Sequence, residues 1–327
     1  MPSWSGWGSW SSSASSSPAP VQSNLESFLH SVTPLVPTKP LSLKSSEEAS
    51  GNDESSVEYF VLEDVWRCYD EWSAYGAGTP VLLNNNRSTT SSDGGKSTTR
   101  VVQYYAPFLS AIQLYTNVSC HETTPIDSSS NNMDDVDVHL HEPAAAARER
   151  NPVAYPYFQY CETISPYWRL PLVDKIAELA ADGFPGLISL KSIDLSPASW
   201  MSVAWCPIYH IPFKGKVEDL STYFLTFHTL SSSFHDYTQG NYNHVSFPFV
   251  VEEAVHAKSE NKISLPPFGL STLRMQGDIW INHVAGDYEK LINLYCAADS
   301  WLKQLKFHHR DFDYYQKINH EVASIYN

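Results

Sequence analysis

The sequence has few basic residues. Its 327 residues include 21 Lys and Arg against 36 Asp and Glu, which gives a formal net charge of −15 at pH 7. Binding to nucleic acid needs concentrated positive charge, and an anionic membrane surface attracts basic segments. We therefore expect neither nucleic acid nor a membrane as the partner.

The sequence also lacks the signals of secretion and membrane insertion. Its five cysteines are far apart and none forms a Cys-x-x-Cys pair, which argues against a disulfide scaffold and a zinc ribbon. There is no run of 18 apolar residues and no secretory signal. We expect a reduced protein of the cytoplasm or nucleus. A plastid transit peptide in the Ser-rich N-terminal segment is the weaker alternative, because that segment has no Arg.

Apolar residues make up 42% of the chain and aromatic residues 13%, which is enough for a sizeable core. The densest apolar stretch is 187–230, and we expect the fold to be organised around it. A short connection at 213–216 favours antiparallel pairing of the strands on either side. The predicted strands are 187–193, 201–211, 220–230, 247–251 and 271–281, with 101–116 forming two short strands or one strand broken at Pro107.

Apolar residues at helical spacing predict helices near 64–75, 171–181 and 287–306, and a short helix after Ser23. Asp64 is the expected N-cap of the first of these and Gly76 its C-cap. Helices and strands do not alternate regularly. The pattern therefore favours an α+β fold, with a central, mostly antiparallel sheet at about 187–281 packed by the helices.

Composition also predicts the limits of the folded part. Residues 1–22 are Ser-rich, with Trp4, Trp7 and Trp10 evenly spaced, and are expected to be a disordered tail. We expect a single domain over 23–315, a C-terminal tail over 316–327, and disordered insertions at 84–100 and 117–152.

Several motifs resemble reactive sites but lack the context that such sites need. Gly94-Gly95-Lys96-Ser97 has no Gly at the start of a phosphate-binding loop and lies in a polar stretch. His139, His141 and Glu142 have no clear further metal ligands nearby, and the same holds for 308–311. Cys206 most resembles a buried, inert thiol. No metal or cofactor is expected.

His210 and His228 are the only candidates that we single out for catalysis. Both lie in predicted central strands, and antiparallel pairing could bring them together. Two histidines can act as general base and general acid, as in metal-free RNA cleavage, with Asp236 or Asp174 orienting one of them. Histidines in strands are also common as satisfied core residues, so both interpretations stay open.

A run of residues in the central stretch carries a family resemblance. Ser199-Trp200-Met201-Ser202-Val203-Ala204-Trp205, followed by Pro207-Ile208-Tyr209 and Ile211-Pro212, resembles the hallmark of a plant family known as domain of unknown function 789. The supporting segments are Asn24-Leu25-Glu26 with Phe28-Leu29, Glu71-Trp72-Ser73-Ala74-Tyr75-Gly76, Gln103-Tyr104-Tyr105, Pro171-Leu172 with Asp174-Lys175-Ile176, Thr226 to Leu230, and Ala298-Asp299-Ser300-Trp301-Leu302.

The resemblance covers about residues 23–315 and implies a plant protein whose activity is unassigned, so it supplies no catalytic residues. The family pattern often has an Arg in place of His210 and an aromatic residue in place of Cys206. This sequence departs from the pattern at both positions, which weakens the two-histidine and Cys206 hypotheses.

The sequence identifies no activity, and the leading interpretation is a non-enzymatic protein that binds a protein partner or a ligand. Trp and Tyr, which are enriched in binding surfaces, suggest an aromatic surface near Trp200, Trp205 and Tyr209. Arg169 is a further candidate, although pairing with a carboxylate is the commoner role. The alternatives are a hydrolase or endoribonuclease-like enzyme using His210 and His228, and an adaptor regulated by phosphorylation of its Ser-rich segments.

Overall fold

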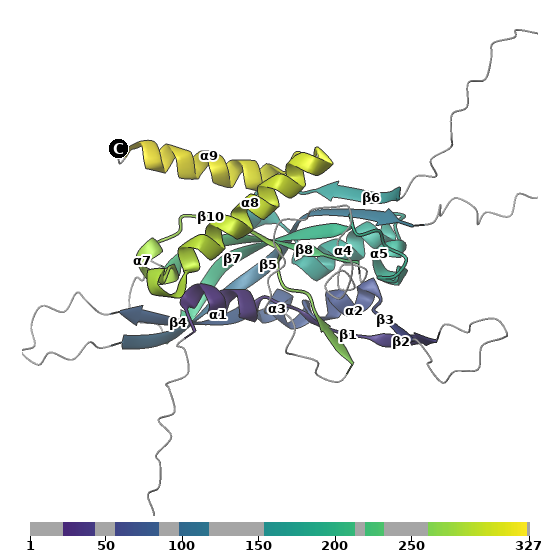
Figure 1. Cartoon of the computed structure of the whole chain (residues 1–327), viewed down its shortest axis with the longest axis horizontal. Helices are drawn as coiled ribbons and strands as arrows, with labels where there is room; N and C mark the ends of the chain where they lie inside the picture. Colours follow the sequence, from purple (N-terminus) through teal and green to yellow (C-terminus); the bar gives the residue numbers. More distant parts are fainter. Residues whose placement is uncertain are drawn as a thin grey trace, which may run out of the picture.

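The computed structural model describes residues 22–42, 56–84, 98–117, 154–212, 220–231 and 261–325. These residues form an antiparallel sheet with helices packed on it, which confirms the predicted α+β class (Figure 1). The strands are β1 (Leu35–Pro37), β2 (Lys39–Ser42), β3 (Ser56–Tyr59), β4 (Ala77–Asn84), β5 (Thr98–Thr116), β6 (Tyr155–Cys161), β7 (Trp200–Ile211), β8 (Tyr223–Thr229), β9 (Lys262–Ser264) and β10 (Gly269–Leu273). The helices are α1 (Asn24–Ser31), α2 (Leu62–Arg67), α3 (Asp70–Tyr75), α4 (Leu172–Ala181), α5 (Gly186–Ser189), α7 (Gly277–Trp280), α8 (Asp287–Leu305) and α9 (Arg310–Ile325), with 3-10 turns η1 (Pro166–Trp168) and η4 (His283–Ala285).

The main sheet has the order β10-β8-β7-β5-β4. A sixth strand, β6, also pairs with β5, further along β5 than β4 does. The predicted antiparallel pairing of β7 with β8 is confirmed, with Trp200 opposite Thr229 and Trp205 opposite Phe224. The sheet begins well before the predicted limit of residue 187, because β4, β5 and β6 belong to it. Two smaller pairs, β1 with β9 and β2 with β3, lie outside it.

β5 is one continuous strand of 19 residues, so the predicted break at Pro107 is wrong. On one side, β5 pairs with β7 from Val102 to Gln113. On the other side, β4 pairs up to Tyr105 and β6 starts at Ala111. Pro107 falls between these two partners, where a residue without an N–H group is tolerated in a strand.

The side chains of β7 alternate between two hydrophobic clusters, one on each face of the sheet. Met201, Val203 and Trp205 belong to the cluster that also includes residues of α1, α2 and α4. Trp200 and Ala204 belong to the cluster formed with α8 and α9. The sheet is therefore covered on both faces, and α8 and α9 lie together over one of them (Figure 1).

Three predicted helices are found close to their expected limits, as α1, α4 and α8. The predicted helix at 64–75 is two short helices, α2 and α3. The first begins after Val61, so Asp64 lies in the first turn and is not the N-cap. Gly76 ends α3 as expected, with a φ of 85°.

Other predictions are wrong because a short run of apolar residues does not distinguish a strand from a helix. The predicted strand at 187–193 is mostly the short helix α5 and a turn. The predicted strand at 271–281 is the end of β10 followed by α7. The expected tail at 316–327 is instead largely the continuation of α9 to Ile325.

Some predictions concern residues outside the described ranges. These are the N-terminal tail, the strand at 247–251, the interiors of the two insertions, and the connection at 213–216. At the borders of the first insertion, β4 extends to Asn84 and β5 starts at Thr98. Within the described ranges, no helix combines the length and apolar content needed to cross a membrane.

Candidate functional site

Trp200 and Trp205 are fully buried, so the predicted aromatic surface at these two residues is wrong. Trp200 packs against Phe227 and Phe307, and its Nε1 donates to Gln113 Oε1 at 2.9 Å. Trp205 packs on the opposite face of the sheet. Both indoles point into the core because they lie in a central strand that is covered on both faces.

His228 belongs to a buried network in which each polar group has a partner. Its Nδ1 lies 2.9 Å from the carbonyl oxygen of Leu265 and therefore donates, which leaves Nε2 as the acceptor. Nε2 lies 2.9 Å from Thr226 Oγ1, and that hydroxyl also accepts from Trp205 Nε1 at 2.9 Å. Burial lowers the pKa of His228 to about 4. These contacts are those of a neutral core histidine.

His210 lies far from His228. His228 is opposite Met201 in β7, and His210 is nine residues further along that strand, where it is opposite Gln103. At about 3.3 Å per residue, this separates the two positions by about 30 Å. The predicted two-histidine site is therefore not formed, and Asp174, the proposed orienting residue, lies in helix α4.

Tyr209 remains on the surface, as predicted. It is 45% exposed, its ring stacks on Tyr104 with 4.6 Å between centroids, and its hydroxyl donates to the Tyr75 carbonyl oxygen at 3.0 Å. Ile208 and Ile211 beside it are also exposed. A binding role for Tyr209 stays a prediction.

The other motifs do not assemble into a reactive site. Cys206 is half-buried, and this burial raises the pKa of its thiol to about 12. Among the described residues no group of three His, Cys, Asp or Glu side chains could hold a metal ion. Gly94–Ser97, His139, His141, Glu142 and Asp236 lie outside the described ranges.

Ser202 and His309 form a buried pair that resembles a nucleophile and its base, with 2.8 Å between Ser202 Oγ and His309 Nε2. His309 Nδ1 accepts from the backbone N–H of Phe312 at 3.1 Å, at the start of α9. The proton of the neutral ring is therefore on Nε2, which donates to the serine. His309 caps a helix in this state and cannot remove a proton from Ser202.

A solvent-facing group of apolar side chains lies between β6 and α4. We call residues 162–170 the aromatic loop. Trp168 is 82% exposed and Tyr167 is 79% exposed, and Ile164 and Leu170 beside them are also exposed. Tyr and Trp with this much accessible surface are unusual, because large apolar side chains are normally buried unless a partner covers them.

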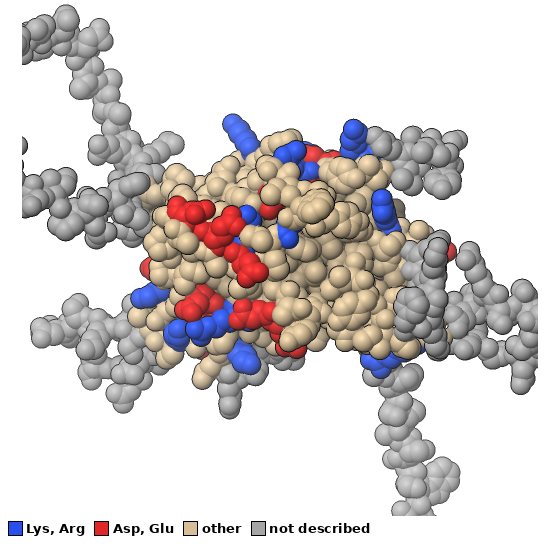
Figure 2. Space-filling model, turned by 180° about the vertical axis from the view of Figure 1, so that it is seen from behind, with Lys and Arg blue, Asp and Glu red and all other residues tan. Residues whose placement is uncertain are grey.

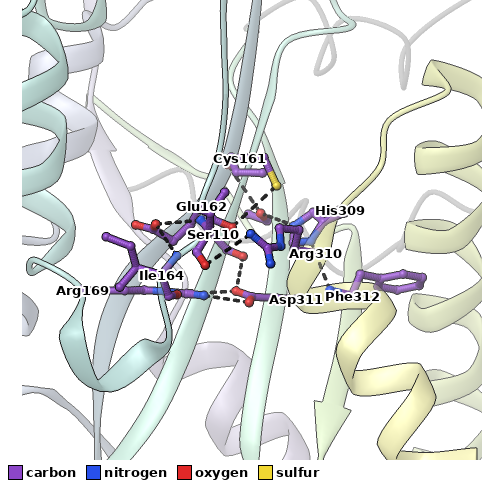
Figure 3. A network of polar contacts seen from close by, with 12 residues as sticks. Ser110, Cys161, Glu162, Ile164, Arg169, His309, Arg310, Asp311 and Phe312 are labelled. Atoms are coloured by element: carbon purple, nitrogen blue, oxygen red, sulfur yellow. Dashed lines mark hydrogen bonds and ion pairs between the residues drawn. The ribbon is translucent and has the colours of Figure 1, made fainter.

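Buried polar side chains hold the backbone of the aromatic loop in place (Figure 3). Arg169 points inward and binds Asp311 of α9 through two hydrogen bonds of 2.7 Å, and its Nε donates to the Ile164 carbonyl oxygen at 2.8 Å. Glu162 is buried and accepts from the backbone N–H groups of Thr163 and Ile164 at 2.8 and 2.9 Å. The loop is thus held at both ends while its apolar side chains point outward.

A β-bulge in β5 supplies a third anchor. Ser110 lies at the register shift between Leu109 and Ala111, and it has no partner residue on β7. Its hydroxyl donates to Asp311 Oδ2 at 2.5 Å, and its carbonyl oxygen accepts from the backbone N–H of Glu162 at 2.8 Å. Bulges re-aim side chains in this way near functional sites.

The buried charges of the anchor balance one another. Burial alone would raise the pKa of Asp311, but the hydrogen bonds and charge of Arg169 outweigh it, and the pKa lies below its ordinary value. For Arg169, burial acts to lower the pKa, but Asp311 and Glu162 raise it above its ordinary value. Both groups therefore stay ionised, and the pair is fixed in its charged state.

Arg169 was a predicted site residue for which pairing with a carboxylate was the commoner expectation, and Asp311 is that carboxylate. Sequence reasoning missed Tyr167 and Trp168, because exposure cannot be read from composition. The one available signal was Pro-Tyr-Trp-Arg-Leu-Pro, in which two prolines and a central Arg indicate a fixed loop.

A comparison with protein families matches most of the described chain. A family model described as "Protein of unknown function (DUF789)" matches residues 23–315. The chain belongs to the DUF789 family. The matched region of this DUF789 protein begins one residue before α1 and ends within α9, so it includes the aromatic loop and all of its anchors. No curated protein and no solved structure matches the chain.

Proposed function

We propose that this protein is a non-enzymatic binding protein that uses the aromatic loop to dock a segment of another protein. The observation that carries the proposal is the contrast between neighbours: Trp168 is 82% exposed and Arg169 is only 8% exposed. Trp, Tyr and Arg are the residue types most enriched in interface hot spots.

The anchoring of the loop supports the same conclusion. A partner that binds a mobile loop must order it, and that loss of conformational entropy weakens binding. Here the backbone is already held by the Glu162 side chain, by Arg169 and by the Ser110 carbonyl oxygen, so Tyr167 and Trp168 are presented in one arrangement. The Tyr167 hydroxyl also lies 2.9 Å from that of Tyr223 in β8, which fixes the second ring.

The amount of apolar surface is also adequate. A fully buried Tyr or Trp side chain removes roughly 150–250 Å² from solvent. Two such rings at about four-fifths exposure, with Ile164 and Leu170 beside them, fall within the roughly 300–600 Å² typical of the largest patch on a monomer, which is often functional.

Site-specific crosslinking tests the proposal. A photoreactive phenylalanine analogue is placed at Trp168 in the full chain, and at Tyr288 as the control. Tyr288 is 52% exposed on α8, so the control also replaces a surface aromatic residue. In native extract, we expect one defined protein to crosslink from position 168, not from 288, and to be lost in a Tyr167→Ala background. Equal crosslinking from both positions, or none from 168, would contradict the proposal.

A further inference from the structure

The segment that joins α8 to α9 alternates between buried and exposed residues. Phe307 and His309 are buried, and Lys306, His308 and Arg310 are exposed. We call these last three the basic strip. Because the two buried side chains are fixed in the core, the three exposed side chains extend from a backbone that is held in place.

The basic strip borders the aromatic loop. Arg310 Nη1 donates to the Thr163 carbonyl oxygen at 3.4 Å, and the His308 carbonyl oxygen accepts from Cys161 Sγ at 3.8 Å (Figure 3). Asp311, the next residue, holds Arg169. The strip and the loop are therefore two parts of one surface.

A further cation, Arg274, follows the strand that pairs with the residue in contact with Tyr167. Tyr167 contacts Tyr223, and Tyr223 pairs with Leu273 at the end of β10. Arg274 follows Leu273 directly and is exposed. Tyr167 thus contacts a strand residue whose β10 partner is followed directly by Arg274.

The described carboxylates of this region cancel only part of these charges. Glu162 and Asp311 are buried, and Asp311 is neutralised by Arg169. Asp313 is exposed and lies 2.9 Å from His308 Nδ1. Among the described residues named here, Lys306, Arg310 and Arg274 leave one positive charge more than Glu162 and Asp313, in a chain with a net charge of −15. The charges on the molecule are unevenly spread, as the face in Figure 2 also illustrates, with acidic side chains gathered on one part and a broad uncharged area beside it.

We propose that the partner segment is an acidic peptide that carries an apolar anchor residue. The anchor packs on Trp168 and Tyr167, and the carboxylates face Arg310 and Lys306 of the strip and Arg274 at the end of β10. This inference rests on the proposed function and names the partner's chemistry. Complementary charges at the rim of an apolar contact increase the association rate and exclude partners of the wrong sign.

A displayed library of random 12-residue peptides, selected on the full chain, tests the inference. We expect the enriched peptides to combine several Asp or Glu residues with one large apolar residue, and to bind about tenfold or more weakly after Arg274→Glu with Arg310→Glu. Glu at position 310 begins α9, where negative charge is favourable, but it removes the hydrogen bond to the Thr163 carbonyl oxygen, so the double variant must also show unchanged thermal unfolding. Lys262→Glu in β9, away from α9 (Figure 1), is the matched charge-reversal control and should leave the affinity unchanged.

The outcomes separate the two proposals. If the enriched peptides depend on Trp168 but are neutral or basic, the proposal of an acidic partner is wrong and the docking role of the aromatic loop still stands. The same holds if their affinity is unchanged by the Arg274 and Arg310 reversal. Failure to enrich any peptide whose binding depends on Trp168 would overturn both. Binding of a single-stranded RNA 12-mer or of neutral lipid vesicles, with loss on Trp168→Ala, would also overturn the acidic peptide.

Discussion

The two hydrogen bonds of 2.7 Å between Arg169 and Asp311 join the aromatic loop to α9, across 142 residues of sequence. The side chains are 2% and 10% exposed, so the pair is desolvated. A desolvated pair contributes little net stability, but loss of one partner leaves an unpaired buried charge. The pair therefore explains how an exposed loop is kept in one position.

Removing only one member of this pair should destabilise the protein strongly. We expect Arg169→Met to lower the free energy of unfolding by about 3–5 kcal/mol, because the Asp311 carboxylate stays buried and, of its described side-chain partners, keeps the Ser110 hydroxyl but loses the opposite charge. Urea denaturation measures the change. Arg169→Met with Asp311→Leu should cost less than Arg169→Met alone. If the single variant loses under about 1 kcal/mol, the pair is not a buried anchor.

The buried and exposed tryptophans should respond differently to truncation. Trp200→Ala and Trp205→Ala should each cost about 3–5 kcal/mol, because a large cavity is left in the core. Trp168→Ala should change stability by less than about 0.5 kcal/mol, because the indole touches mainly solvent. Thermal unfolding of the three variants checks the expectation, and a large loss for Trp168→Ala would show that this indole is structural.

Stability should fall in mild acid. Burial lowers the pKa of both His228 and His309 from 6.5 to about 4. Between these values the unfolded chain binds more protons than the folded one, so the free energy of unfolding decreases as the pH falls from about 6.5 to about 4. His309→Asn keeps an acceptor that can cap α9 but removes one titrating group.

Urea titrations at several pH values in this range give the free energy of unfolding as a function of pH. For His309→Asn this dependence should be shallower than for the parent protein, by the equivalent of up to one bound proton. His308→Asn is the matched control, because His308 is next to His309 but largely exposed. An unchanged slope for His309→Asn would mean that His309 does not stay neutral in the folded state.

Ser202 should be unreactive. Because Nδ1 of His309 accepts from Phe312, the ring proton is on Nε2 and points at the serine. Nitrogen-15 NMR should show His309 as the neutral tautomer protonated at Nε2, and a fluorophosphonate probe should leave Ser202 unlabelled. Labelling at Ser202 that disappears in His309→Asn would indicate a nucleophile and contradict a purely structural role.

Helices and strands were predicted correctly where the apolar residues follow a clear helical spacing or form a dense run typical of a buried strand. α4 and α8 have clear apolar stripes, and β7 and β8 have dense apolar runs, so their type and approximate limits were correct. We predicted a break in β5 because proline lacks the N–H group that a paired strand needs. The pairing of the strands shows that Pro107 lies between the part of β5 that pairs with β4 and the part that pairs with β6, where proline is tolerated. α9 was missed although Phe312, Tyr315 and Ile318 recur every three residues.

The site was less predictable than the fold. Trp200 and Trp205 were expected at a surface because Trp is common in interfaces, but long apolar strands bury their aromatic residues when both sheet faces are covered. Arg169 was identified, yet its partner Asp311 is distant in sequence, and the bulge that aims Ser110 at it has no sequence signature. Exposure of Tyr167 and Trp168 follows from these long-range contacts.

Fluorine NMR of protein labelled with 5-fluorotryptophan tests the docking role of Trp168 most directly. The Trp168 signal, assigned by its loss in Trp168→Phe, should show a large solvent isotope shift in the free protein, unlike the signals of Trp200 and Trp205. When the selected peptide or the crosslinked partner is added, we expect the Trp168 signal to move and to lose that shift while the two core signals stay in place. A Trp168 signal that is unchanged at saturating partner would contradict the account.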